Sequence, residues 1–181
     1  MMDVVIRGGE LIDGSGTGRR RADLGIKDGV ISAIGEINEK ADRVIDADGR
    51  VVCPGFIDLH SHADRGILKF RPAENYIRQG VSSLFCGNCG SSPTDIGRFF
   101  EDLRNGGTGP NIAILIGHGS IRQEVVGRRD VVPNGDQLNR MKQLVRKAMQ
   151  DGAVGLSTSL RYGAGSFART DEIVALAGEI K

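Results

Sequence analysis

Two histidines separated by one residue, His60 and His62, are the first side chains in the sequence that could carry chemistry. On an extended segment, side chains two residues apart point to the same face, so both imidazoles can bind one cation. A single histidine is more often a packed or surface residue, but these are two of only three histidines in the chain. The pair therefore favours a metal site, in which Asp58 or Asp64 could orient an imidazole through its second nitrogen.

A Cys-x-x-Cys motif formed by Cys86 and Cys89 supplies the second candidate group. Such motifs occur in thioredoxin-like redox pairs and in zinc ribbons. A redox pair needs its first cysteine at a helix N-terminus, whereas Gly87, Gly90 and Pro93 favour irregular structure here. A ribbon needs a second cysteine pair, which the sequence lacks. In a third interpretation one thiolate joins the two histidines, and thiolate with imidazole selects zinc over magnesium or calcium.

From residue 56 onward, short apolar runs alternate with segments whose apolar residues recur at helical spacing. These strands and helices must position the histidine pair and the Cys-x-x-Cys motif. The strands are expected at residues 56–60, 81–86, 112–116 and 153–157, and the helices at 73–78, 94–103, 138–149 and 170–180. Thr94, which follows Pro93, is expected to cap the second helix, and Thr170, Asp171 and Glu172 are expected to cap the fourth. Four β-α units imply a parallel α/β sheet, either doubly wound or part of a (β/α)8 barrel. Parallel strands share one carboxyl edge, so the histidines and the cysteines should meet there.

The length of the chain favours the barrel. Four units fill residues 54–181, whereas a complete barrel takes ~250 residues. The sequence also stops directly after the last helical stripe, so we expect residues 54–181 to be the first half of a barrel, truncated. The alternative is a complete small four-stranded α/β domain. Residues 1–53 alternate in a two-residue period with Asp-Gly turns between the runs, which predicts antiparallel hairpins in a small β-subdomain.

Composition narrows the class of protein. The 181 residues carry 24 Lys+Arg against 23 Asp+Glu, a formal net charge of +1, which excludes a polybasic arm for nucleic acid or a membrane surface. No apolar run is long enough to span a bilayer, and the first residues lack the features of a signal peptide. A cytoplasmic location without nucleic-acid or membrane partners is therefore expected. The three cysteines are expected to be free thiols or ligands.

Four motifs together resemble a known family. Residues 52–62 (VCPGFIDLHSH) are similar to the entry motif of the amidohydrolase superfamily. The segments 87–90 (GNCG), 117–122 (GHGSIR) and 155–160 (GLSTSL), the last followed by Tyr162, resemble its D-aminoacylase (N-acyl-D-amino-acid deacylase) branch. The resemblance covers the whole chain. It implies a TIM-like (β/α)8 amidohydrolase barrel, of which residues 54–181 are the N-terminal part, preceded by half of a small β-sandwich in residues 1–53.

The resemblance also implies residue roles and an activity. His60 and His62 match the metal pair after the first barrel strand, and Cys89 matches the thiolate that binds zinc. Tyr162 matches a tyrosine that helps to hold the substrate carboxylate. Residues 153–160 contain no lysine, so the carboxylated lysine of other superfamily members is absent and the cysteine can take its place. The implied reaction is zinc-dependent hydrolysis of the amide bond of N-acyl-D-amino acids, with the general base expected beyond Lys181.

Two rival functions stay open, namely an amidohydrolase acting on cyclic amides and a non-catalytic metal-binding or redox module using Cys86 and Cys89. His118 is expected to be structural or close to substrate and not a metal ligand. Arg122 is expected to be an exposed loop residue or, alternatively, a partner of a substrate carboxylate. Because a half barrel leaves a sheet edge and an apolar face uncovered, the chain alone is expected to self-associate and to be inactive.

Overall fold

The computed structural model describes residues 1–180, which form two compact units. The first unit is Met1–Pro54 and the second begins at Gly55. Within the described residues, no helix combines the length and the apolar character needed to cross a bilayer.

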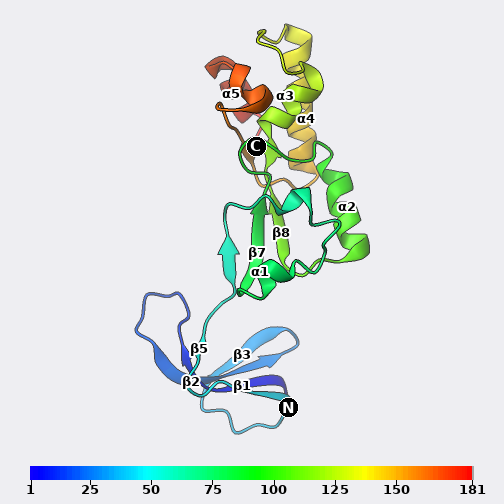
Figure 1. Cartoon of the computed structure of the whole chain (residues 1–181). Helices are drawn as coiled ribbons and strands as arrows, with labels where there is room; N and C mark the ends of the chain where they lie inside the picture. The colour runs from blue at the N-terminus through cyan, green and yellow to red at the C-terminus, as the bar shows by residue number, and fades with distance from the viewer. Residues whose placement is uncertain (181) are drawn as a thin grey trace. The chain divides into compact units, whose positions relative to one another are not determined.

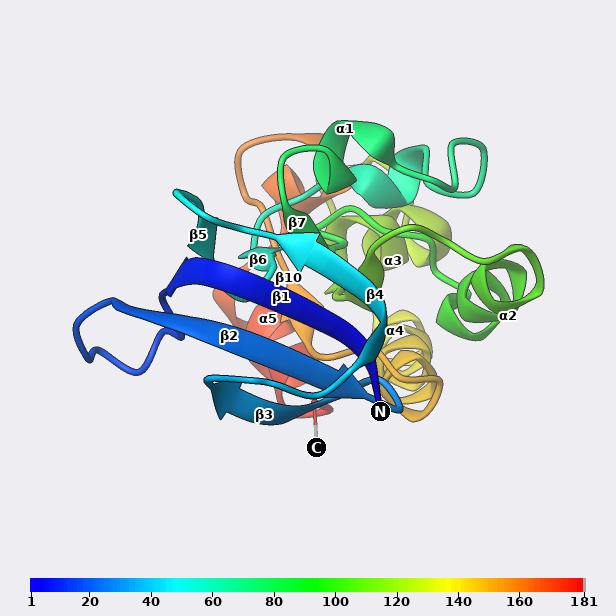
Figure 2. The same ribbon diagram turned by 90° about the horizontal axis from the view of Figure 1, so that it is seen from below.

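The first unit is a five-stranded sheet, in which β1 lies between β2 and β4 (Figure 2). Its strands are β1 (Met2–Leu11), β2 (Arg20–Lys27), β3 (Val30–Gly35), β4 (Ala41–Asp46) and β5 (Val51–Val52). The pairs β1/β2 and β2/β3 are antiparallel hairpins, as the Asp-Gly turns predicted.

The prediction of hairpins throughout this unit was wrong for its last part. Both β4 and β5 pair with β1 in parallel, β4 along the first half of β1 and β5 along its end. The Asp48-Gly49 turn between them does not reverse the chain, because the Asp46 side chain accepts a hydrogen bond from the Asp48 N–H and Arg50 N–H donates to the Ala47 carbonyl. This small loop lets β5 continue in the direction of β4.

The second unit contains two sets of parallel strands. One sheet has the order β6-β7-β8, with β6 (Phe56–Asp58), β7 (Val81–Cys86) and β8 (Asn111–Ile114), and β7 and β8 lie side by side in Figure 1. The other pair is β9 (Ile116–Gly117) with β10 (Leu156–Ser157). The apolar run predicted as one strand at 112–116 is thus divided at Leu115, whose N–H donates to the Cys86 carbonyl.

Five α-helices and two 3-10 turns lie between or after these strands within residues 1–180. They are α1 (Glu74–Ile77), α2 (Ile96–Gly106), α3 (His118–Val125), α4 (Gly135–Gln150), α5 (Thr170–Ala177), η1 (Ala63–Arg65) and η2 (Gly163–Phe167). The side chain of Asp95, and not that of Thr94 as predicted, caps α2 by accepting from the Arg98 N–H. At the start of α4, Asn134 and Gln137 form a reciprocal capping box. The sequence pattern did not predict α3.

The core of the second unit joins the strands to the helices. Leu84, Ile114 and Ile116 from the strands are fully buried, as are Met141 and Val145 of α4. Burying one such side chain stabilises the fold by roughly 1.5–3 kcal/mol. This packing fixes the strand ends, where the candidate site lies.

Candidate metal centre

The three predicted metal ligands lie after two neighbouring strands. His60 and His62 follow β6, and Cys89 follows β7, which pairs with β6 in parallel. The Ser61 N–H donates to the Phe85 carbonyl at 2.9 Å, so the histidine segment stays attached to β7 beyond the end of β6. Adjacent parallel strands thus bring both groups to one edge, as the sequence predicted.

The ligand atoms of these three residues converge. Sγ of Cys89 is 3.3 Å from Nε2 of His60, and the two imidazole centroids are 5.7 Å apart. One ligand atom from each residue lies within 4.8 Å of the others. His60 is exposed, whereas His62 and Cys89 are half-buried, so the cluster is open to solvent on one side.

The donor set fits a zinc ion. Two imidazoles and one thiolate are the ligand types that zinc prefers, and three protein ligands with one open position is the arrangement of catalytic zinc sites. Nδ1 of His62 is buried without a hydrogen-bond partner among residues 1–180, which marks this ring as unsatisfied by the chain itself. The role of His60, His62 and Cys89 as metal ligands stays a prediction.

The turn that carries Cys89 is fastened to the histidine segment. The amide of Asn88, 7% exposed, donates to the carbonyls of Ser61 at 3.2 Å and Phe85 at 2.8 Å. Ser61 is the residue between the two histidines. Asn88 therefore holds the cysteine turn and the histidine pair in one frame, a function that the motif alone did not reveal.

Neither aspartate near the histidines orients an imidazole, contrary to the prediction. The Asp58 carboxylate accepts a hydrogen bond from the backbone N–H of His60 at 3.0 Å. The Asp64 carboxylate is buried and accepts from the Gly87 N–H at 3.2 Å. Both carboxylates are used by the backbone, so they shape the loops that carry the ligands.

The other cysteine of the motif is part of the core. Cys86 is fully buried at the end of β7, and burial raises the pKa of its thiol to about 11. A thiol with such a pKa stays protonated at neutral pH and is a poor nucleophile or ligand. The two cysteines therefore differ in environment, which argues against the redox interpretation.

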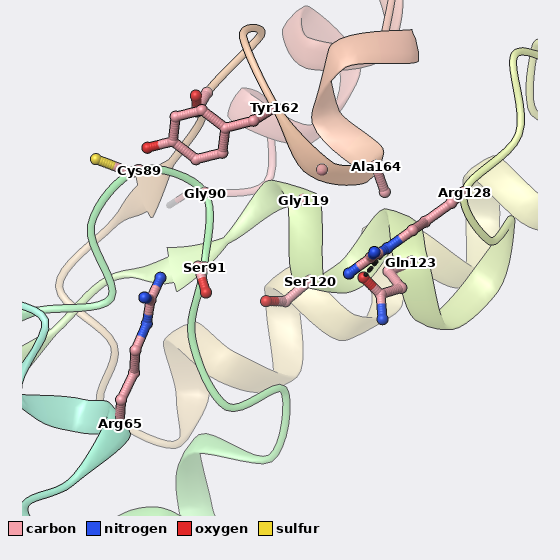
Figure 3. Close-up of a pocket in the computed structure, with 12 residues that line it drawn as sticks. Arg65, Cys89, Gly90, Ser91, Gly119, Ser120, Gln123, Arg128, Tyr162 and Ala164 are labelled. Carbon is pink, nitrogen blue, oxygen red and sulfur yellow. Dashed lines mark hydrogen bonds between the residues drawn. The ribbon is translucent and has the colours of Figure 1, made fainter.

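A cavity of about 190 Å³ lies beside the cluster and has Cys89 in its wall (Figure 3). Tyr162, which is 53% exposed, lines the same cavity. Two arginines that the sequence analysis did not single out also line it, and Arg65 extends toward Ser91 and the cysteine turn, while Arg128 contacts Gln123. Serines, glycines and Ala164 complete the wall, which contains no carboxylate. Nothing in the sequence around either arginine indicated that it would line a cavity.

Comparison with known proteins agrees with this geometry. A sequence profile described as the amidohydrolase family matches residues 43–178. The chain belongs to the amidohydrolase family. It is 34% identical to a D-aminoacylase and 35% identical to an N-acyl-D-glutamate deacylase, both from Alcaligenes xylosoxydans xylosoxydans, over 95% and 97% of its length. This amidohydrolase chain spans about two fifths of those relatives, 40% and 41% respectively.

Solved structures show the same relationship. The N-acyl-D-glutamate deacylase of Bordetella bronchiseptica, solved with zinc and a phosphonate mimic of the tetrahedral intermediate, superposes with a TM-score of 0.92 at 34% identity. A D-aminoacylase with a binuclear metal centre gives the same TM-score at 32% identity. The match covers 97% and 99% of this amidohydrolase chain and 42% and 43% of those structures. The fold is therefore that of the N-terminal portion of these larger enzymes.

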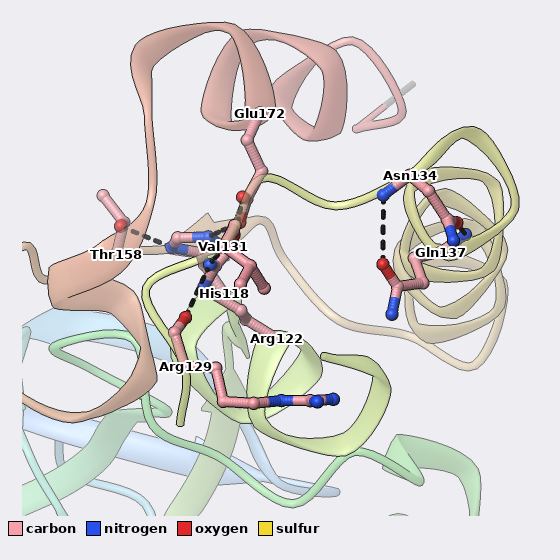
Figure 4. Close-up of polar contacts among 8 residues, drawn as sticks. All are labelled: His118, Arg122, Arg129, Val131, Asn134, Gln137, Thr158 and Glu172. Atoms are coloured by element: carbon pink, nitrogen blue, oxygen red, sulfur yellow. Dashed lines mark hydrogen bonds and ion pairs between the residues drawn. The ribbon is translucent and has the colours of Figure 1, made fainter. Parts of the chain in front are cut away.

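A second polar cluster of this amidohydrolase joins α3 to α5 (Figure 4). His118 is fully buried and hydrogen-bonds Thr158 at 2.9 Å and Glu172 at 2.8 Å. Arg122 is also fully buried, pairs with Glu172 and donates to the Val131 carbonyl. Of the two roles expected for His118, its contacts support the structural one.

The predictions for Arg122 and for the cap of the last helix were wrong. Arg122 is neither an exposed loop residue nor free to meet a substrate carboxylate, because it lies inside α3 with its charge matched by Glu172. We expected Thr170, Asp171 and Glu172 to cap the last helix, yet Arg169 occupies the N-cap without a side-chain hydrogen bond. Glu172 instead turns inward and is 4% exposed, because it compensates the buried arginine.

Proposed function

We propose that this chain is the N-terminal part of a zinc-dependent amidohydrolase that hydrolyses the amide bond of N-acyl-D-amino acids. The observation that carries the proposal is the convergence of two imidazoles and one thiolate, within 4.8 Å, beside a cavity at the ends of parallel strands. The names of the relatives, D-aminoacylase and N-acyl-D-glutamate deacylase, supply the substrate class.

The roles of the residues follow from their positions. His60, His62 and Cys89 would hold the metal. The Tyr162 hydroxyl would donate a hydrogen bond to the substrate carboxylate in the adjoining cavity. A bound zinc would act as a Lewis acid and would lower the pKa of a bound water to about 7. Water adds to the acyl carbon and the C–N bond breaks, which gives a carboxylate and a free D-amino acid. The general base is expected beyond Lys181.

Two features favour this function over its rivals. An amidohydrolase for cyclic amides such as hydantoins would be expected to use a lysine after the fourth strand, and residues 153–160 have none. A redox module would need both thiols accessible, and Cys86 is buried in the core. We propose a cytoplasmic location, because Cys89 must stay reduced to serve as a ligand.

The division of the chain is part of the same proposal. Residues 1–53 would form half of a small β-sandwich, and residues 54–181 the first half of the barrel. Among the described strands β6 pairs only with β7, and its Phe56 and Ile57 side chains are each 59% exposed. Such an edge favours pairing with a second copy, so the isolated chain should self-associate, which light scattering would show.

The proposal is tested with two proteins. The 181-residue chain alone should bind zinc weakly and show no turnover, because it carries only part of the site. A chimera joining residues 1–180 to the remaining C-terminal part of the Alcaligenes D-aminoacylase should hydrolyse N-acetyl-D-amino acids, be inhibited by a chelator and be restored by zinc. Turnover of the L enantiomers at the same rate, or activity that persists in Cys89→Ala, would contradict the proposal.

A further inference from the structure

The turn that presents Cys89 has an unusual backbone. Gly87, Cys89 and Gly90 have φ angles of 73°, 55° and 70°, all in the left-handed region. For a residue with a side chain this region costs about 1–2 kcal/mol, so contacts around the turn must hold Cys89 there.

One side chain from a distant strand spans both ends of this turn. Oγ of Ser157 accepts a hydrogen bond from the Gly90 N–H at 2.9 Å and donates its own proton to the Gly87 carbonyl. Cys89 lies between these two glycines. The hydroxyl therefore closes the turn in the conformation that directs the thiolate toward His60, 3.3 Å away.

The strand that carries Ser157 is itself anchored. Ser157 lies in β10, where it pairs with Gly117 of β9. The next residue, Thr158, hydrogen-bonds the buried His118, which in turn contacts Glu172 (Figure 4). Because β10 and Thr158 are held in this way, the Ser157 side chain has little freedom to move with the turn.

The turn also has little room on the side where it faces the residues next to β9 and β10. A Cβ atom at Gly90 would come within 3.0 Å of the Ser159 nitrogen, and one at Gly87 within 2.0 Å of the Leu115 carbonyl oxygen. On the opposite side, Asn88 fastens the turn to Ser61. The turn is thus held between the histidine segment and β10.

We infer that Ser157 is a positioning residue for the metal centre, fixing Cys89 in its ligating position through the backbone of the turn. The inference rests on the proposed function, since it assumes that Cys89 binds the metal. Ser157 is not among the three clustered ligand residues, so its effect should fall on the cysteine ligand and not on the histidines. Residues that orient ligands in this way typically change metal affinity by roughly 10–100-fold.

The test uses the 181-residue chain and cobalt(II) as a spectroscopic substitute for zinc. Ser157→Ala should weaken zinc binding roughly 10–100-fold in competition with a chelator and reduce the thiolate-to-cobalt charge-transfer band relative to the d–d bands. Ser157→Thr keeps the hydroxyl and should restore both. Ser166→Ala is the matched control, because Ser166 is exposed and its hydroxyl donates to the Gly163 carbonyl within the η2 turn.

The outcomes separate the inference from the proposed function. Absence of metal binding by the unmodified chain would overturn both. Binding by the unmodified chain with equal affinity and an equal charge-transfer band in Ser157→Ala would overturn the inference alone. If Ser157→Ala does not fold, as judged by thermal unfolding, the Ser157→Thr variant decides, because weak binding by that folded variant would also overturn the inference.

Discussion

Two clusters of polar side chains lie close to the carboxyl ends of the strands in the second unit, and they differ in how their polar atoms are satisfied. In the inner cluster His118 and Arg122 are buried and both bond to the buried Glu172. Only Nε of Arg122 lacks a hydrogen-bond partner in this cluster among residues 1–180. In the outer cluster His60 and Cys89 face solvent or the cavity, and no carboxylate partner is bonded to either side chain among residues 1–180.

The difference shows which cluster stabilises the fold and which is available for chemistry. Buried charges with partners fasten α3 to α5. The outer cluster gathers, next to a cavity, three side-chain atoms of the types that bind metals. Histidine occurs in both, so residue type alone does not reveal the role, whereas the partners of each ring do.

The largest effect should come from breaking the inner cluster. Glu172→Ala leaves the buried Arg122 charge uncompensated and should lower the free energy of unfolding by about 3–5 kcal/mol. Asp171→Ala, at the exposed neighbouring position, is the control and should change it by less than about 0.5 kcal/mol. Urea unfolding of the metal-free chain measures both. Equal losses would mean that the buried pair contributes nothing specific.

The next effect should appear in the outer cluster. Cys89→Ala removes one of the three proposed metal ligands and should weaken zinc binding by at least about 100-fold, the upper end of what indirect substitutions cause. The stability of the metal-free chain should change little, because the Cys89 side chain is half-buried and outside the core. Chelator competition and urea unfolding, run together, check both parts. A large loss of stability without loss of zinc binding would reverse the assignment.

Cys86→Ala should do the opposite of Cys89→Ala, because it should lower stability and leave zinc binding unchanged. Its effect should also be smaller. The Cys86 side chain is fully buried in the core, and its truncation should cost about 1–2 kcal/mol of stability while zinc affinity is unchanged. Mass spectrometry under oxidising conditions is the added measurement. A reversible Cys86–Cys89 disulfide, with equal functional loss in both variants, would favour the redox module instead.

The outer cluster could be predicted from the sequence because its geometry is local to strand ends. His60 and His62 follow one strand and Cys89 the next, and the shared edge of a parallel sheet brings them together without further information. The β7 strand, Val81–Cys86, was predicted at its observed bounds.

The inner cluster could not be predicted, because it depends on contacts across the fold. Glu172 lies 54 residues after His118, and an acidic residue at a helix start looks like a cap. Arg122 resembled a surface arginine, since nothing local indicates its burial. The same limit explains the Asp48-Gly49 turn, which reads as a hairpin although β4 and β5 both run parallel to β1.

The smallest effect should come from the tyrosine beside the outer cluster. In the chimera, Tyr162→Phe removes one hydroxyl from the cavity wall and should raise KM for an N-acetyl-D-amino acid roughly two- to tenfold, since a hydrogen bond contributes about 0.5–1.5 kcal/mol. Zinc affinity should not change, because Tyr162 is outside the ligand cluster.

The chain has one other tyrosine, Tyr76, which provides the matched control. Its hydroxyl is 3.1 Å from Oγ of Ser61 and does not line the cavity, so Tyr76→Phe should leave KM unchanged. If Tyr162→Phe lowers kcat and zinc affinity together while KM stays constant, Tyr162 supports the metal centre and not the substrate carboxylate. The comparison would then extend the outer cluster from three residues to four.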